Sequence, residues 1–475
     1  MTVLERIKSC QAPALHLGKR GFKDESVTIC SVLCENTILN SADKTIYKRM
    51  DHQYLRFLND IASERKESLL RVTFNEQNES AGIIKMGGGM PNPKLSPIRE
   101  GSLTLADGRM ITLNEPLMEE ALQYGSSTGY GPLMKQIESL TQRFHAPPCW
   151  PNTMMFVTAG SLSGLSLAIE AMISKGDYII IDNPCYPGTL AITDPYKPRY
   201  LGVEADADGM NPESLRSVLS PWNPQKAREA THGVPKFLYT NPNGCNPTGG
   251  VTTTERKKEI YKIASEYNII ILEDDPYYFL QFRDQKDFPP SYLSLDVDGR
   301  VIRFDSFSKS LSAGLRVGYI TGPQPLIKRL NYHQQCSVSH ASMLSQVIIS
   351  EILRLMGEDG FLEHVRKVQE FYRSQRDKML DAATKHLSGL CQWDVPAGGM
   401  FFWMKVVGVK DTLKLTKKLS ETKRVIVIPG VGFLPQENQA SPYIRISFST
   451  ATKQEMDEGF RRIAELLKEE AAVNK

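Results

Sequence analysis

The chain has 475 residues and lacks a long apolar run, a Cys-x-x-Cys pair and a strong excess of charge. No apolar run approaches the roughly 20 residues that a membrane-spanning helix needs. The eight cysteines include no Cys-x-x-Cys pair, and no histidine or cysteine cluster completes a metal site around Cys30 and Cys34. A net charge of +3 is too small to indicate binding to nucleic acid or to an anionic membrane. We therefore expect neither a membrane nor a nucleic-acid partner, and no bound metal.

The first residues also lack the apolar core of a secretory signal. Four basic residues between positions 8 and 23 leave a mitochondrial presequence open, but three acidic residues between positions 5 and 25 count against it. The scattered cysteines are typical of reduced, mostly buried thiols. The sequence therefore predicts a cytoplasmic protein.

What is present is an alternation of short apolar runs with helical stretches. Buried strands that alternate with helices indicate an α/β domain with a largely parallel sheet. Predicted helices cover residues 162–173 and 256–267. The expected strands are 154–158, 178–182, 237–240, 269–272, 301–304 and 317–321.

The pattern changes after residue 360, which predicts a second, smaller domain of the α+β kind. A polar helix is expected over 362–380, and the tail places Met456, Phe460 and Ile463 on one helical face. Further strands are expected at 397–403, 425–430 and 443–448. We predict a segment 1–85 that contributes to the small domain or forms a lid, a large domain 86–360 and a small domain 361–475. The glycine-rich loop that begins at Gly87 lacks the flanking strand and helix of a dinucleotide-binding motif.

One lysine stands where an apolar strand ends. The segment 305–309 reads Asp-Ser-Phe-Ser-Lys and follows the apolar residues of the strand predicted at 301–304. Burial of an ammonium group is unfavourable, but this cost is removed if the amine is consumed in a bond to an aldehyde. A desolvated lysine also loses proton affinity and becomes a nucleophile. Alone, Lys309 also fits a strand-end lysine whose amine reaches solvent.

Other strand ends carry polar groups that fit one flat, anionic ligand, because ligands of open α/β sheets lie beyond the carboxyl ends of the strands. Gly160 and Ser161 begin a helix, whose free N–H groups suit a phosphate, although a plain helix cap fits them equally. Tyr186 fits a stacking ring or an ordinary core tyrosine. Asn246, held between two prolines, fits a hydrogen-bond donor to a phenolate oxygen.

The fourth predicted strand ends in three consecutive carboxylates, residues 273–275. Such a run needs a cationic partner, because the charges repel one another. A protonated ring nitrogen would serve for Asp275, with Tyr278 three residues further on. Ser306 and Arg316 near Lys309 would complete a phosphate site. Together these groups fit the phosphate, ring, O3′, ring nitrogen and aldehyde of pyridoxal 5′-phosphate.

From about residue 86 onward the chain resembles the class I/II aminotransferases of the pyridoxal-phosphate fold type I. The matching motifs are the segment 243–249, which resembles the family's Asn-Pro-Thr-Gly turn, the Asp-x-x-Tyr pair of Asp275 and Tyr278, and the Ser-x-Ser-Lys segment at 306–309 with Arg316. The narrower likeness, carried by residues 184–189 and 273–282, is to fungal aromatic aminotransferases and kynurenine/2-aminoadipate aminotransferases. The resemblance implies a seven-stranded, mostly parallel sheet between helices, with a smaller domain built from the N- and C-terminal parts.

The resemblance also implies roles for single residues. Lys309 would bind the cofactor covalently and move the reaction's proton, with Asp275 on the ring nitrogen and Asn246 and Tyr278 on O3′. Arg445 would bind the substrate α-carboxylate, together with Asn246. Leu162 departs from the polar residue that some relatives have after Ser161. The implied phosphate ligands are Gly160, Ser161, Ser306, Arg316 and, from a neighbouring subunit, Tyr124, which implies a homodimer with shared sites.

The implied function is transfer of an amino group from phenylalanine, tyrosine or tryptophan to a 2-oxo acid such as 2-oxoglutarate, by a ping-pong mechanism. Action on 2-aminoadipate or kynurenine is the alternative. A lyase that uses the same cofactor stays open, as does a regulator that senses it, although residues 1–85 contain no strong basic helix. Tyr130, Tyr186, Phe401 and Phe402 are candidates for the substrate side-chain pocket.

Overall fold

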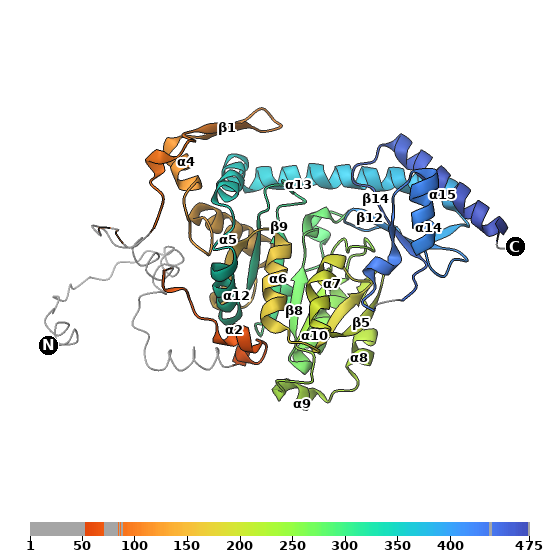
Figure 1. Ribbon diagram of the computed structural model, residues 1–475, viewed down its shortest axis with the longest axis horizontal. Coiled ribbons are helices and arrows are strands. Elements are labelled where there is room, and N and C mark those ends of the chain that lie inside the picture. Colours follow the sequence, from red (N-terminus) through yellow and green to blue (C-terminus); the bar gives the residue numbers. More distant parts are fainter. Residues whose placement is uncertain (1–52, 71–83, 85, 87–88, 437–438, 474–475) are drawn as a thin grey trace, which may run out of the picture. The chain divides into compact units, whose positions relative to one another are not determined.

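A large mixed sheet with helices on both faces carries the candidate site (Figure 1). The computed structural model describes residues 53–70, 84, 86, 89–436 and 439–473. These belong to one unit, Gln53–Lys475. The strands, in their order across the sheet, are β3 (Thr153–Thr158), β10 (Gly318–Pro323), β9 (Val301–Ser306), β8 (Ile270–Asp274), β7 (Phe237–Thr240), β4 (Tyr178–Asn183), β5 (Arg199–Asp206) and β6 (Gly209–Met210).

The predicted fold class is confirmed, with one more strand than expected. Strands β9, β8, β7, β4 and β5 run parallel, whereas β10 is antiparallel to both of its neighbours. The eighth strand, β6, has two residues and extends β5 as an antiparallel edge. The sequence analysis missed β5 because exposed polar residues interrupt its apolar pattern.

Alternation of side chains along each strand fills hydrophobic cores on both faces of the sheet. In β4, Ile179 and Ile181 pack with residues of α6, whereas Ile180 packs with residues of α10 on the other face. The helices are α2 (Asp60–Glu64), α4 (Glu115–Ala121), α5 (Gly131–His145), α6 (Ser161–Met172), α7 (Pro187–Thr193), α8 (Pro212–Leu219), α9 (Pro224–Glu229), α10 (Thr254–Tyr267), α11 (Tyr292–Leu295), α12 (Gln324–Ser337), α13 (Met343–Leu387), α14 (Leu413–Lys418) and α15 (Lys453–Val473).

The second sheet has four antiparallel strands and packs against α15 and the C-terminal part of α13. Its strands, in order, are β11 (Cys391–Trp393), β12 (Phe401–Val406), β14 (Tyr443–Ser447) and β13 (Ile428–Pro429). The strand expected at 425–430 is wrong in extent, since only Ile428–Pro429 pairs with β14. A separate hairpin joins β1 (Gly101–Thr104) and β2 (Met110–Leu113).

Helix α13 connects the two sheets, because it contacts α4 and α5 near its start and α15 further on. The predicted domain boundary at 360/361 lies inside this helix, three residues after Gly357, where the backbone leaves the helical conformation. Residues 1–52, 71–83 and 85 of the predicted N-terminal segment lie outside the described residues, so the lid stays a prediction. In the described part of that segment, Tyr54 and Phe57 belong to the core of the large sheet.

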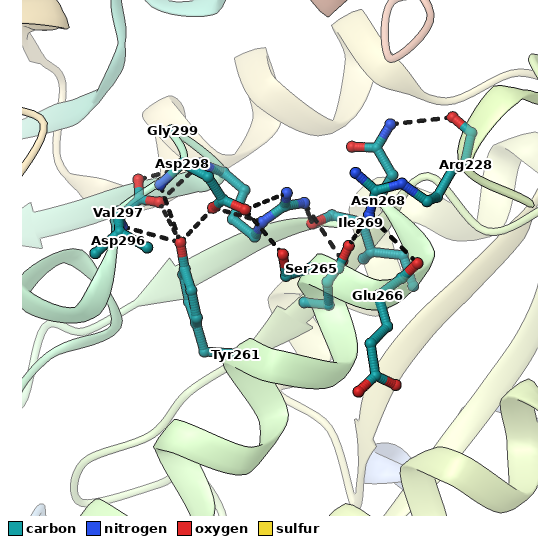
Figure 2. A network of polar contacts seen from close by, with 12 residues as sticks. Arg228, Tyr261, Ser265, Glu266, Asn268, Ile269, Asp296, Val297, Asp298 and Gly299 are labelled. Atoms are coloured by element: carbon teal, nitrogen blue, oxygen red, sulfur yellow. Dashed lines mark hydrogen bonds and ion pairs between the residues drawn. The ribbon is translucent and has the colours of Figure 1, made fainter. Parts of the chain in front are cut away.

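A polar network joins the C-terminal part of α10 to the residues that precede β9 (Figure 2). The Tyr261 hydroxyl of α10 bonds to the carboxylates of Asp296 and Asp298, and Ser265 donates to Asp298 over 2.9 Å. Arg300, one residue before β9, pairs with Asp298 at 2.6 Å. These charges are therefore satisfied within the scaffold.

Among the described residues, no helix has the length and apolarity needed to cross a bilayer.

Candidate active site

A pocket with a cavity volume of about 150 Å³ lies beyond the carboxyl ends of the parallel strands. Lys309 lines it from the turn after β9, and its Nζ lies 5.9 Å from the centre of the Tyr277 ring. Burial lowers the pKa of this amine, and the guanidinium of Arg316 lowers it further. The pocket therefore holds a lysine that loses its proton more readily than an exposed one. Of the other residues predicted from the sequence, those that line the pocket are Ser161, Tyr186, Asn246, Ser306 and Arg316.

One end of the pocket is built for an anion. Helix α6 begins at Ser161, so its first N–H groups and the positive end of its dipole lie there. Arg316 donates to the Ser308 hydroxyl over 3.1 Å and forms no ion pair with any described carboxylate. Gly160 has φ +84°, and a Cβ at this position would overlap the Arg316 guanidinium. These features fit a phosphate group, as the sequence analysis expected.

Arg445 approaches the pocket from β14 of the second sheet. Its Nη1 donates to Oδ1 of Asn246 over 2.9 Å. The guanidinium lies over the ring of Phe401, 4.3 Å from the ring centre, and 5.1 Å from that of Phe433. Its Nε is buried and has no hydrogen-bond partner among the described residues. Two aromatic rings thus orient the guanidinium of Arg445, which retains N–H donors for a carboxylate.

The carboxylate that lines the pocket is Asp274, not the predicted Asp275. Because side chains alternate along β8, Asp274 lies on the face of the sheet that carries Tyr239, whereas Asp275 lies on the other side. The same shift by one residue places Tyr277, not Tyr278, in the pocket. The predicted positions of Asp275 and Tyr278 at the ligand are therefore wrong by one residue each.

Asp275 instead belongs to a buried ion cluster around Arg303, whose side chain is fully buried. Its Oδ2 lies 2.8 Å from Nη1 of Arg303, and the same nitrogen lies 3.2 Å from Glu273. The Nη2 of Arg303 pairs with Asp305 at 2.8 Å. The Tyr278 ring packs against this guanidinium, 5.0 Å from it. The cation that the run of carboxylates requires is thus partly supplied by the protein itself.

Asp274 has the properties that a protonated ring nitrogen requires. Its Oδ2 accepts a hydrogen bond from Tyr239 over 3.0 Å, while its buried Oδ1 has no partner in the part of the chain that the structure describes. Burial raises the pKa of Asp274 to about 7, although the bond from Tyr239 opposes that rise. A cationic N–H group at Oδ1 would remove the unfavourable desolvation of the carboxylate. The pocket residues therefore fit pyridoxal phosphate.

Four polar residues of the pocket were not among the predicted site residues: Asn241, Asp274, Tyr277 and Ser308. The sequence signal that favours Asp274 and Tyr277 over Asp275 and Tyr278 was Arg303, a charged residue inside an apolar strand. In the parallel register of β8 and β9, Arg303 lies beside Glu273, which marks that face as the ion-paired one. Asn241 had no comparable signal, since turns are generally rich in asparagine.

Tyr124 and two of the predicted pocket aromatics lie away from the pocket. Tyr124 is 55% exposed and makes an edge contact with His340. Phe402 is buried in the core of the second sheet, and Tyr130 in the core that includes α5 and α13. The neighbouring subunit that Tyr124 was expected to serve stays a prediction.

Comparison with known proteins gives a consistent result. The profile of the family "Aminotransferase class I and II" matches residues 112–463. The mitochondrial kynurenine/alpha-aminoadipate aminotransferase of Bos taurus is 43% identical over 423 residues, which is 88% of this chain and 99% of that protein. An aromatic amino acid aminotransferase of Dictyostelium discoideum is 31% identical and covers 91% of this chain and 92% of its own. The crystal structure of aminotransferase Aro8 from Candida albicans superposes with a TM-score of 0.78 at 26% identity, covering 89% of this chain and 98% of that one.

Proposed function

The chain belongs to the class I and II aminotransferases, and we propose that it uses pyridoxal phosphate to transfer the amino group of aromatic amino acids to a 2-oxo acid. The observation that carries the proposal is one pocket lined by three ionisable side chains that form no ion pair among the described residues: Lys309, Asp274, whose buried Oδ1 also has no hydrogen-bond partner there, and Arg316. They match the aldehyde, ring nitrogen and phosphate of the cofactor. When bound, pyridoxal phosphate supplies an electron-withdrawing ring that stabilises negative charge at the substrate α-carbon.

The chain's own residues hold the reactants and move the proton. Asp274 keeps the ring nitrogen protonated, and its carboxylate becomes satisfied in doing so. Asn246 has its Oδ1 occupied by Arg445, which leaves its Nδ2 to donate to the phenolate oxygen O3′. The hydroxyl of Tyr277 is the second group available for that oxygen. Lys309, with its lowered pKa, is the base that takes a proton from the substrate α-carbon and returns it.

Aromatic walls support a substrate with a ring. Tyr186 and Tyr277 line the pocket, and Phe401 lies between Tyr277 and Arg445, 6.3 Å from the Tyr277 ring centre. Arg445 would bind the α-carboxylate through a bidentate pair, so the substrate side chain would lie near these rings. Kynurenine also carries a ring, and the 43% identical relative named for kynurenine and alpha-aminoadipate favours it as the second candidate.

A substrate panel tests the proposal. Phenylalanine, tyrosine, tryptophan, kynurenine and 2-aminoadipate are each supplied with 2-oxoglutarate, and the 2-oxo acid product and ammonia are both measured. An aminotransferase gives the 2-oxo acid without ammonia, whereas a lyase releases ammonia. Turnover of the ring-bearing substrates above 2-aminoadipate supports the aromatic preference, and the reverse order contradicts it.

We also propose a homodimer, based on apolar side chains exposed on the segment from residue 95 to residue 124. Exposed apolar residues close together in a soluble protein mark an interaction surface. A pocket beside α4 is lined by Leu95 and Leu122 of this segment. Light scattering after gel filtration tests the proposal, since a monomeric mass would contradict it. The exposed apolar residues are Leu95, Ile98, Leu103, Met110, Leu122 and Tyr124.

A cytoplasmic location remains our proposal from the sequence, where acidic residues interrupt the basic stretch between positions 5 and 25. The relative from Bos taurus is named as mitochondrial, so the compartment of this protein should be tested directly. Fractionation of the source cells, followed by detection of the protein in cytosol and mitochondria, would decide between the two compartments.

A further inference from the structure

Asn241 lines the pocket at the point where the carboxyl ends of β4, β7 and β8 meet. It follows β7 directly and is 4% exposed. Its Oδ1 accepts the backbone N–H of Asn246 over 2.8 Å, and its Nδ2 donates to the backbone carbonyl of Asp274 over 2.6 Å. One amide side chain therefore joins the loop that carries Asn246 to the strand end that carries Asp274.

The backbone of Asn241 is itself fixed from β4. Its N–H donates to Oδ2 of Asp182 over 2.8 Å, and the neighbouring Thr240 hydroxyl donates to Oδ1 of the same carboxylate over 3.2 Å. Asp182 is buried at 4% exposure. Since every group of this network is buried and bonded, its geometry has little freedom.

We propose that Asn241 is a positioning residue, whose amide sets the distance between the Asn246 amide and the Asp274 carboxylate. The inference rests on the proposed function and deepens it. Asparagine in a turn usually bonds within its own loop, whereas the Nδ2 of Asn241 reaches a different strand. Asn246 in turn accepts from Arg445. The amide of Asn241 therefore influences both the cofactor contacts and the group assigned to the substrate carboxylate.

The test compares Asn241→Leu with Asn243→Leu. Asn243 is the same residue type in the same loop and is fully buried. Its amide bonds to Asp275 over 2.7 Å and to Lys257 over 3.1 Å, on the side away from the pocket. Both substitutions remove two buried hydrogen bonds and keep the branched shape of the side chain. A purely structural role of Asn241 would thus leave the absorbance of the bound cofactor unchanged in both variants.

Three quantities are measured for each variant: thermal stability, the dissociation constant for pyridoxal phosphate, and the pH midpoint of the visible absorbance of the bound cofactor. Asn241→Leu should raise the dissociation constant about tenfold, as expected for one or two lost hydrogen bonds. It should also move the absorbance midpoint by about 0.5 pH unit. Asn243→Leu should lower stability and leave the midpoint unchanged. Equal midpoints for Asn241→Leu and the wild type would overturn the inference.

Asn241→Asp provides a second test, which also serves if Asn241→Leu does not fold. A carboxyl group between Asp182 and Asp274 would have a raised pKa. Protonated at pH 6, it can accept from Asn246 and donate to Asp274, so affinity for pyridoxal phosphate should equal that of the wild type at pH 6. Ionised at pH 8.5, it has no proton to donate, and affinity should fall below that of the wild type. Equal affinities at both pH values would contradict the role of the amide.

Failure of the inference is distinguishable from failure of the proposed function. If the wild-type protein binds no pyridoxal phosphate, the proposed function fails. If the wild type binds the cofactor and transfers amino groups, but the variants at positions 241 and 243 behave alike, only the role of Asn241 is contradicted.

Discussion

Asp274 and Asp275 are consecutive residues whose carboxylates lie on opposite sides of the end of β8. Asp274 lines the pocket and has a buried oxygen without a partner among the described residues. Asp275 is 2.8 Å from Arg303 and also accepts from Asn243. The two carboxylates therefore have different functions: Asp274 is available to a ligand, whereas Asp275 stabilises the interior of the protein.

This relationship predicts opposite phenotypes for two matched substitutions. Asp274→Asn should lower kcat/KM about 100- to 1,000-fold, because charge stabilisation at the ring nitrogen is lost. Asp275→Asn should lower the free energy of unfolding by about 2 kcal/mol, since Arg303 keeps two other carboxylates. Steady-state kinetics and urea unfolding measure the two effects. A larger loss of kcat/KM in Asp275→Asn than in Asp274→Asn would contradict the assignment.

The stability of the cofactor-free protein should fall as the pH rises toward neutrality. Burial raises the pKa values of Asp182 and Asp274 to about 7, well above the value of about 3.9 in an unfolded chain. Their contribution to stability is therefore complete below about pH 4 and is lost as the pH rises through about 7. Urea midpoints between pH 4 and pH 8 measure this loss. Asp274→Asn should show a smaller loss than the wild type, and an identical pH dependence would refute the raised pKa.

Arg445→Gln should lower kcat/KM about 100-fold for every amino acid tested, because all substrates share the α-carboxylate. Lys405→Gln is the matched control, since Lys405 is an exposed residue of the adjacent strand β12. It should leave kcat/KM unchanged. A loss in Arg445→Gln that is confined to one substrate would mean that this arginine contacts the side chain rather than the carboxylate.

Gly160→Ala should weaken the binding of pyridoxal phosphate at least about tenfold, because the backbone conformation at φ +84° strongly favours glycine. The added methyl group would also displace the guanidinium of Arg316. Gly459→Ala, in α15, adds the same methyl group in open space and should leave the affinity unaffected. Fluorescence titration of the cofactor-free variants compares the two. Wild-type affinity in Gly160→Ala would place the phosphate elsewhere.

The sequence was sufficient to predict the edge of the sheet and much of the pocket lining. Lys309, Asn246 and Ser161 follow apolar runs, and the carboxyl ends of parallel strands meet at one edge of a sheet. A polar residue within a few positions of the end of such a run is therefore placed near the others without knowledge of the tertiary fold.

The face that each strand residue occupies was less predictable. In the run from Glu273 to Asp275, all three carboxylates are chemically able to serve a ring nitrogen. The choice depends on which of them Arg303 neutralises, and this is a contact between two strands. Similarly, the two bonds of Asn241 become visible only when the Asn246 loop and the end of β8 are placed together.

The central claim is that Lys309 binds pyridoxal phosphate covalently. Borohydride reduction of the protein loaded with the cofactor, followed by peptide mass mapping, tests it most directly. We predict the cofactor mass on the peptide that contains Lys309, and its absence in Lys309→Ala, which should fold but lose nearly all turnover. Lys257 is the natural competitor, because it is fully buried and burial lowers its pKa to about 8. A label on Lys257, or no label on any lysine, would contradict the account.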